Sequence, residues 1–187
     1  MTEGRDWVAV VEAGACPDCG FDAGTFPRRE IAAATRANAG QWRALLLRSD
    51  AGALRTRPTP TTWSALEYGA HVRDVLAIMG ARVEHVVREH EPELGWWDHD
   101  AAATDERYNE QEISEVAAAI VARAENFSTA IEAVPDGAWG RGAIRGDGNR
   151  FTVEGIVRFT LHEVCHHRAD ALASLGGEGG EGSHTGN

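Results

Sequence analysis

Basic residues are scarce in this chain, which has no lysine and 18 arginines against 29 aspartate and glutamate residues. The formal net charge is therefore −11. Proteins that bind nucleic acid independently of sequence need clustered positive charge to displace counterions from phosphates, so this balance argues against nucleic acid as a partner. It argues in the same way against an anionic membrane surface.

Long apolar runs are also lacking. No stretch approaches the ~20 apolar residues that a membrane-spanning helix needs. The N-terminus carries Glu3, Arg5 and Asp6 at positions where a secretory signal peptide would be apolar. We therefore expect a cytoplasmic protein that has no membrane partner.

Cysteine is too rare for a disulfide framework, since the chain has 3 cysteines. Cys16 and Cys19 form the sequence Cys-Pro-Asp-Cys-Gly, and Cys165 lies far along the chain. The pair is similar to one knuckle of a zinc ribbon, but the second cysteine pair is missing. We interpret Cys16 and Cys19 as structural or incidental residues in a reducing compartment, with metal binding and redox chemistry as the alternatives.

Four stretches have the apolar periodicity of amphipathic helices, and almost no part of the chain resembles a paired strand. Ser64 and Glu67 form a capping box that marks the start of the second helix. The chain has 187 residues, of which 43% are hydrophobic, enough for a single core. We predict an all-α protein, a four-helix bundle. Its helices are expected at about residues 28–49, 64–90, 113–134 and 152–175.

The remaining segments complete the predicted organisation. We expect an N-terminal segment over residues 1–24, the bundle over residues 25–176, and a disordered glycine-rich tail over residues 177–187. The connection over residues 50–62 is rich in proline and threonine and is expected not to continue the first helix. The residues that we expect in the core include Trp42, Leu46, Val72, Leu76, Ile120, Phe127, Ile156 and Leu172.

Two further connections contain residues of interest. The one over residues 91–110 is long enough to be a functional lid, but we interpret its Trp96 and Trp97 as packing over one end of the bundle. A glycine-rich connection holds Arg141, Arg145 and Arg150. These arginines could meet a substrate carboxylate, but we interpret the segment as a solvated loop.

Histidines on the fourth helix point to a metal site. His162 with His166, and Glu163 with His167, both have the i, i+4 spacing with which two side chains can bind one ion. On a helical wheel, His167 lies roughly 70° and Glu163 roughly 110° from the centre of the apolar face, whereas His162 and His166 lie more than about 140° away, towards solvent. The wheel therefore favours Glu163 and His167, with His162 and His166 as the alternative pair.

A third ligand is expected from another helix. His71 flanks the apolar face of the second helix, one turn after Glu67. The alternative for His71 is a hydrogen-bonded histidine at a helix interface. Asp170 follows His167 by three residues and could accept a hydrogen bond from its ring, which would orient the imidazole. Together these residues predict a divalent metal held by His71, Glu163 and His167.

The segments "TWSALEYGAHVRDVL" around His71 and "FTLHEVCHHRADAL" around His167 resemble the DinB/YfiT-like superfamily of metalloenzymes. That superfamily includes the metal-binding domains of mycothiol-dependent maleylpyruvate isomerases. The resemblance covers roughly residues 25–176 and implies a four-helix bundle with three metal ligands near one end. Some members use two histidines spaced by four on the last helix. The isomerase type uses Glu-x-x-x-His, which here falls on Glu163 and His167.

Function is predicted from the ligand set and from the resemblance. Two imidazoles and one carboxylate leave an open position on the ion, as in catalytic zinc sites. The resemblance implies a low-molecular-weight thiol such as mycothiol, used for S-transfer or isomerisation. One alternative is a hydrolase that uses metal-bound hydroxide. Another is a non-catalytic bundle that a structural metal ion stabilises and that binds a small molecule. We expect zinc as the ion, with nickel, iron or manganese as alternatives, a small-molecule substrate, and bundle faces that would allow a homodimer.

Overall fold

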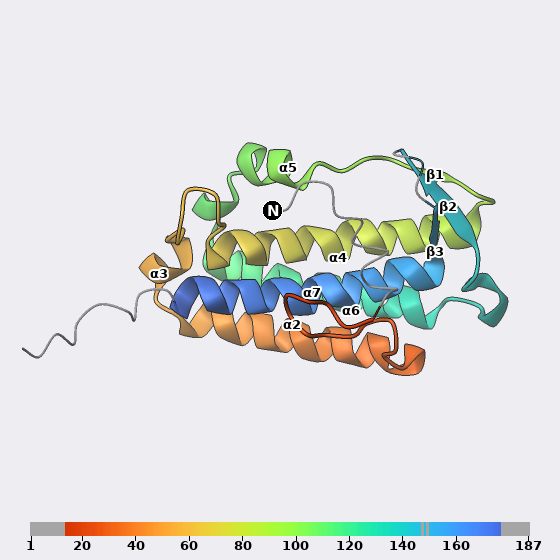
Figure 1. Ribbon diagram of the computed structural model, residues 1–187, viewed down its shortest axis with the longest axis horizontal. Helices are drawn as coiled ribbons and strands as arrows, with labels where there is room; N and C mark the ends of the chain where they lie inside the picture. The colour runs from red at the N-terminus through yellow and green to blue at the C-terminus, as the bar shows by residue number, and fades with distance from the viewer. Residues whose placement is uncertain (1–13, 147, 149, 177–187) are drawn as a thin grey trace, which may run out of the picture.

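The computed structural model describes residues 14–146, 148 and 150–176, and most of them belong to four long helices that lie side by side (Figure 1). Both α2 and α4 pack against α6 and α7. This confirms the predicted all-α four-helix bundle. The tail over residues 177–187, which we expect to be disordered, lies outside the described residues. The four helices are α2 (Ile31–Arg48), α4 (Ala65–Arg88), α6 (Ile113–Glu132) and α7 (Val153–Gly176).

Local capping explains where α4 begins. Oγ of Ser64 accepts a hydrogen bond from the backbone N–H of Glu67 at 3.2 Å, and the Glu67 carboxylate accepts one from the backbone N–H of Ser64 at 2.8 Å. This is the predicted capping box, which satisfies two N–H groups that the helix itself cannot pair. The capping box fixes the register of α4, and so the direction in which His71 points.

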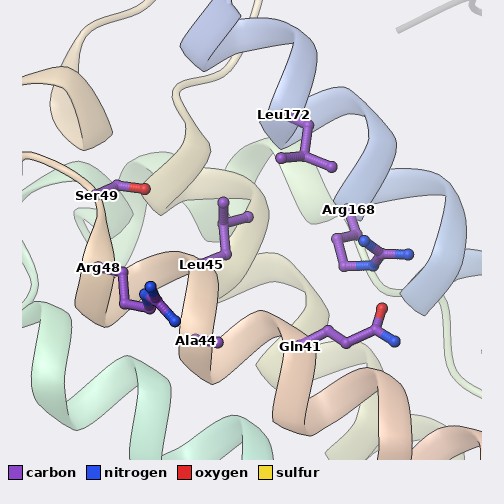
Figure 2. A pocket seen from close by; sticks show the side chains of 7 residues that line it. All are labelled: Gln41, Ala44, Leu45, Arg48, Ser49, Arg168 and Leu172. Carbon is purple, nitrogen blue, oxygen red and sulfur yellow. The ribbon is translucent and has the colours of Figure 1, made fainter.

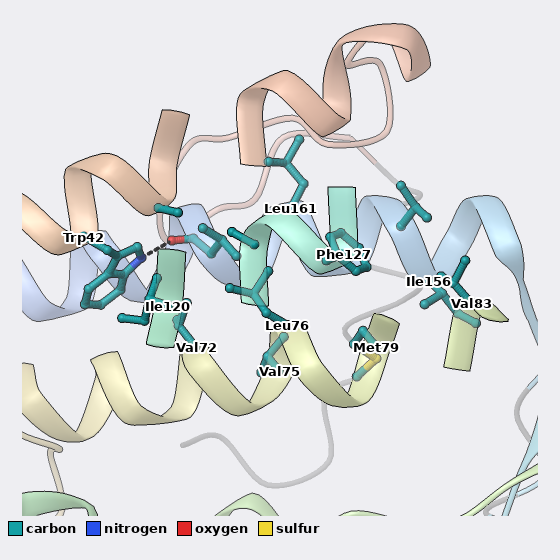
Figure 3. Close-up of a cluster of buried hydrophobic side chains, with 14 of the residues drawn as sticks. Trp42, Val72, Val75, Leu76, Met79, Val83, Ile120, Phe127, Ile156 and Leu161 are labelled. Atoms are coloured by element: carbon teal, nitrogen blue, oxygen red, sulfur yellow. Dashed lines mark hydrogen bonds between the residues drawn. The ribbon is translucent and has the colours of Figure 1, made fainter. Parts of the chain in front are cut away.

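The hydrophobic core lies between the four helices. One hydrogen bond inside this core joins α2 to α7. The indole Nε1 of Trp42 donates a hydrogen bond to the backbone carbonyl of Val164 at 2.9 Å (Figure 3). The structure confirms burial for seven of the residues that we expected in the core, which are Trp42, Leu46, Val72, Leu76, Ile120, Phe127 and Ile156.

The eighth expected core residue is not buried. Leu172 is 47% exposed, because it lies on the outer edge of the seam between α2 and α7. There it lines a groove of about 310 Å³ together with Leu45 and Arg168 (Figure 2). None of the candidate metal ligands lines this groove.

Short helices occupy two of the connections. α3 (Ala51–Arg55) begins at Asp50, whose side chain accepts hydrogen bonds from the backbone N–H groups of Gly52 and Ala53. α2 ends at Arg48, so the expectation that residues 50–62 do not continue the first helix is confirmed, and α3 is a separate single turn that an aspartate cap stabilises. α5 (His99–Asp105) and the 3₁₀ turn η2 (Tyr108–Glu110) follow α4 in the long connection, and α5 lies beside the first half of α4 (Figure 1).

A small sheet lies at the end of the bundle where α4 ends and α7 begins (Figure 1). β1 (Glu93–Leu94) pairs in parallel with β2 (Gly142–Arg145), and β2 pairs antiparallel with β3 (Arg150–Thr152). The 3₁₀ turns η1 (Arg28–Glu30) and η3 (Asp136–Ala138) precede α2 and β2. The prediction of a solvated loop here was wrong, because strands this short carry too few residues to show an alternating pattern.

The three arginines of this region have protein partners. Arg145 lies over the rings of Trp96 and Phe151. Arg150 pairs with the carboxylate of Glu91, and Arg141 donates to a backbone carbonyl at the end of α4.

Residues 14–27 form a segment with little regular structure that crosses α7, as the red end of the chain shows in Figure 1. Arg158 on α7 donates to the backbone carbonyls of Ala23 at 2.6 Å and Phe26 at 2.9 Å. A tight turn begins the segment, in which the N–H of Gly20 donates to the carbonyl of Cys16 at 2.8 Å. Within the described residues, no helix has both the length and the apolar character needed to cross a lipid bilayer.

Candidate metal centre

The bundle brings His71 of α4 together with Glu163 and His167 of α7. Oε2 of Glu163 lies 3.5 Å from Nε2 of His71 and 3.3 Å from Nε2 of His167. Nitrogen and oxygen ligands about 2.1 Å from a tetrahedral ion lie about 3.4 Å from one another. The two distances from Glu163 therefore match those around a single divalent ion, and all three donor atoms lie within 4.8 Å of one another.

The chemistry of His71 also fits an ion. Its side chain is buried, and among the described residues neither ring nitrogen has a hydrogen-bond partner. A buried imidazole without partners is costly, because it has lost its hydrogen bonds to water. A metal at Nε2, beside the carboxylate of Glu163, would supply the missing interaction.

Asp170 occupies the position that we expected for a residue that orients His167. Its Oδ2 lies 3.0 Å from Nδ1 of His167. An N–H donated from Nδ1 to this carboxylate leaves the lone pair on Nε2, the nitrogen that faces Glu163. The contact therefore holds His167 in the tautomer and the orientation of a metal ligand.

Burial and neighbouring charges act differently on the three ligands. Burial lowers the pKa of His71 to about 4, so this imidazole is neutral near pH 7. Burial opposes ionisation of Glu163, but His167, His162 and His71 outweigh it and hold the pKa of this carboxyl well below its usual range. Burial also opposes a charge on His167, yet Glu163 and Asp170 raise its pKa to about 9, so near pH 7 Nε2 carries a proton that a metal ion would have to displace. Glu163 is therefore ionised and attracts positive charge, which a cation can supply.

Aromatic side chains that our sequence analysis did not assign to the site surround His71. Trp97 stacks on its ring with the centroids 5.4 Å apart, and Trp63 lies 5.3 Å away. His99 of α5 lies 5.8 Å from His71, and Tyr68 stacks on His167. Tyr68 lies on α4 itself, three residues before His71, and Trp63 just precedes that helix. Only the contacts of Trp97 and His99 depend on how the connection after α4 folds back, which position along the chain does not indicate.

The two tryptophans of that connection differ. Trp97 is half-buried against His71, whereas Trp96 is 62% exposed. The interpretation that both pack over the end of the bundle is therefore wrong for Trp96. Trp97 instead forms part of the wall of the candidate metal centre.

His162 and His166 lie on a different side of α7. Both are buried, at 1% and 8% exposure, so the expectation that they face solvent is wrong. The helical wheel correctly places them away from the apolar face of α7. They are nevertheless buried, because the segment over residues 14–27 covers that side of the helix. They do not join the group formed by His71, Glu163 and His167.

Cys16 and Cys19 meet these two histidines. Sγ of Cys16 lies 3.6 Å from Nδ1 of His166, and Sγ of Cys19 lies 3.9 Å from Nε2 of His162. The sequence carries a signal that could have found this group, since Cys-x-x-Cys and His-x-x-x-His are the two halves of a common zinc-ligand pattern. The two halves are separated by 142 residues, so the sequence alone does not show that they belong to one ligand set.

The two thiols differ in acidity. Burial opposes ionisation of Cys16, but the backbone N–H groups of Cys19 and Asp18 and the side chain of His162 lower its pKa below the ordinary value. Burial raises the pKa of Cys19 to about 11. The third thiol, Cys165, is also buried enough for its pKa to rise to about 11.

Comparison with known proteins places the chain in a family. The structure is similar to that of YfiT from Bacillus subtilis, described as a probable metal-dependent hydrolase with an unusual four-helix bundle topology. The TM-score is 0.74 at 14% sequence identity, over 79% of this chain and 85% of YfiT. No protein of curated function matches the sequence. The model of the DinB superfamily matches residues 34–171, so this chain belongs to the DinB superfamily.

Proposed function

We propose that this protein is a divalent-metal-dependent enzyme that activates a small thiol for S-transfer or isomerisation. The observation that carries the proposal is the group formed by His71, Glu163 and His167. These residues come from two helices, and all three are buried. Three protein ligands are typical of catalytic sites, whereas structural zinc sites have four. A metal that only staples the bundle would need a fourth.

A divalent ion at this site supplies Lewis acidity, which lowers the pKa of a thiol or a water that binds it. Glu163 contributes one negative charge, so a divalent ion together with its three ligands would keep one positive charge, which attracts an anionic sulphur. Asp170 holds His167 in its orientation. These groups are fixed by the two helices before a substrate arrives, and such preorganisation makes a metal site catalytically effective.

The walls of the site favour a small molecule with an apolar part. Trp63, Trp97 and Tyr68 border the two histidine ligands with their rings. Aromatic walls exclude water and strengthen the electrostatic interactions within the site. The half-buried His99 beside His71 is the side chain best placed to exchange a proton with a bound substrate.

Hydrolysis is the second candidate function, and the similarity to YfiT favours it because that protein is described as a probable metal-dependent hydrolase. The same three ligands would then serve a water molecule in place of a thiol. The two functions differ in what must bind at the open position, and that difference can be measured.

Cobalt substitution can test the proposal, since a thiolate bound to Co²⁺ gives a charge-transfer band. The protein should carry Cys16→Ser and Cys19→Ser, so that the only thiol reaching the ion is the one added. We expect the band to appear when mycothiol or another small thiol is titrated, and to be lost in a variant that also carries His71→Ala. Ester or amide hydrolysis without the band would favour the hydrolase. A fourth protein ligand and no activity would favour the non-catalytic bundle.

A further inference from the structure

The group of Cys16, Cys19, His162 and His166 has four donor atoms that all lie within 4.8 Å of one another. A sulphur and a nitrogen bound to the same tetrahedral zinc, at about 2.3 Å and 2.1 Å, lie about 3.6 Å apart. The two sulphur–nitrogen distances, 3.6 Å and 3.9 Å, are close to this value. The pairs come from opposite ends of the chain, so local sequence does not force them together.

The chain around the cysteines turns so that both sulphurs face α7. The N–H of Gly20 donates to the carbonyl of Cys16, and the N–H of Cys16 donates to the carbonyl of Phe21 at 3.0 Å. Gly20 has a φ of +74°, in the left-handed region where a side chain would be strained. The glycine therefore permits a compact loop with its two cysteine side chains on one side.

Both histidines have a carboxylate on the ring nitrogen that faces away from the cysteines. Nδ1 of His162 lies 3.5 Å from Oε1 of Glu163, and Nε2 of His166 lies 3.4 Å from Oδ2 of Asp170. Metal-bound histidines typically direct their second nitrogen to a carboxylate, which fixes the tautomer that can bind the ion. The nitrogens left to bind are the two that face Cys19 and Cys16.

We propose that Cys16, Cys19, His162 and His166 bind a second metal ion, a structural zinc that fastens the segment over residues 14–27 to α7. Two thiolates and two imidazoles form a closed tetrahedral set, for which zinc is the typical ion. The two thiols release their protons when the ion binds. This proposal is independent of the function proposed above, because it concerns a different ligand set.

The segment itself explains why an ion is useful. It has no helix or strand between residues 14 and 27, and its fully buried apolar side chains are Cys16 and Ala23. Phe21 and Phe26 pack against the core but are only partly buried, so hydrophobic burial offsets only part of the entropy that the segment loses on ordering. A zinc that joins Cys16 to His166, 150 residues apart, would close a long loop and hold the segment in place.

The two ligand sets meet through shared carboxylates. Glu163 faces His71 and His167 with Oε2, and His162 with Oε1. Asp170 contacts both His166 and His167 through Oδ2. His162 and His166 thus contact Glu163 and Asp170, the two acidic residues of the first site, and help to hold them in place.

Metal counting on the full-length protein tests the proposal. After purification in zinc-containing, chelator-free buffer, we expect about two zinc ions per chain. The Cys16→Ser/Cys19→Ser variant should lose one ion, and His71→Ala/His167→Ala should lose the other. Cys165→Ser is the matched control and should keep both ions. An unchanged count in Cys16→Ser/Cys19→Ser would overturn the second site, whereas an unchanged count in His71→Ala/His167→Ala would overturn only the first.

Measurements on the unsubstituted protein guard against misfolded variants. In the cobalt-substituted protein we expect thiolate-to-cobalt charge transfer without added thiol, and in the zinc protein X-ray absorption should show sulphur at about 2.3 Å. The charge-transfer band should persist in His71→Ala/His167→Ala and in Cys165→Ser. Absence of sulphur around the metal, or a disulfide between Cys16 and Cys19 in zinc-supplemented protein, would refute the proposal.

Discussion

Oδ2 of Asp170 lies 3.0 Å from Nδ1 of His167, and the same oxygen lies 3.4 Å from Nε2 of His166. One carboxylate oxygen therefore contacts one histidine from each of the two candidate ligand sets. The arrangement arises because α7 places histidines at successive positions, about 100° apart, and Asp170 follows them by three and four residues, which is close to one turn.

Replacing Asp170 with asparagine should weaken metal binding without removing a ligand. An amide does not carry the charge that stabilises the imidazole as a ligand, and loss of such a partner typically lowers metal affinity by ~10–100-fold. Competition titration with a chromophoric chelator measures the change. Glu115→Gln, which alters an exposed acid on α6, should leave the affinity unaltered. Equal affinity in Asp170→Asn and the unsubstituted protein would show that this contact has no role in holding the ion.

Tyr108 should make stability depend on pH in the alkaline range. The hydroxyl is buried and donates to Oδ2 of Asp74 at 2.7 Å, and burial, followed by the Asp74 carboxylate, raises the pKa of Tyr108. The folded state then keeps a proton that the unfolded chain loses above a pKa of about 10. Stability from this proton is therefore full below about pH 10 and is lost as the pH rises further.

Urea unfolding of the unsubstituted protein and of Tyr108→Phe tests this sign. We expect Tyr108→Phe to be the less stable protein near neutral pH, since Asp74 loses a hydrogen bond, at a typical cost of about 1–3 kcal/mol for a buried partner. The difference in unfolding free energy should shrink when the pH is raised above about 10. A difference that stays constant or grows with pH would contradict the raised pKa of the tyrosine.

The bundle and the proximity of His71, Glu163 and His167 could be predicted because helices carry their own pattern, whereas metal binding by these three residues stays a prediction. The spacing that placed Trp42 and Phe127 in the core also turned His167 towards α4, where His71 lies on a capped helix. The second group could not be found on the wheel of α7, which has no information about what covers its other side. Segments with no periodicity, such as the loop that carries Cys16, take their place from tertiary contacts alone.

Cys16 and Cys19 should be dispensable for the ion at His71. Neither sulphur belongs to the group of His71, Glu163 and His167. The cysteines are connected to that group only indirectly, because their partners His162 and His166 contact the carboxylates of Glu163 and Asp170. In Cys16→Ala/Cys19→Ala we expect one ion per chain to remain, with the affinity of the first site little changed. Isothermal titration of the metal-free variant measures both values. A folded double variant that binds no metal would move the catalytic ion to the cysteines.

The choice between the two pairs on α7 is the most specific prediction of the site. We predict that Glu163 and His167 bind the catalytic ion with His71, and that His162 and His166 do not. The first pair is supported by the donor distances and by the buried ring of His71, which has no hydrogen-bond partner in the part of the chain that the structure describes. The alternative set of three histidines would bind late divalent metals well, but His162 and His166 face the cysteines instead.

Single substitutions in the Cys16→Ala/Cys19→Ala background make this test unambiguous, because the second group can then contribute no complete ligand set. Metal content should fall to near zero in Glu163→Ala and His167→Ala, since each removes one of three ligands and leaves the others buried around an incomplete site. It should stay at one ion per chain in His162→Ala and His166→Ala. Circular dichroism should show the same helical content in all four. Loss of the ion in His162→Ala and His166→Ala, with retention in the other two, would reverse the assignment on α7 while leaving a metal-binding bundle.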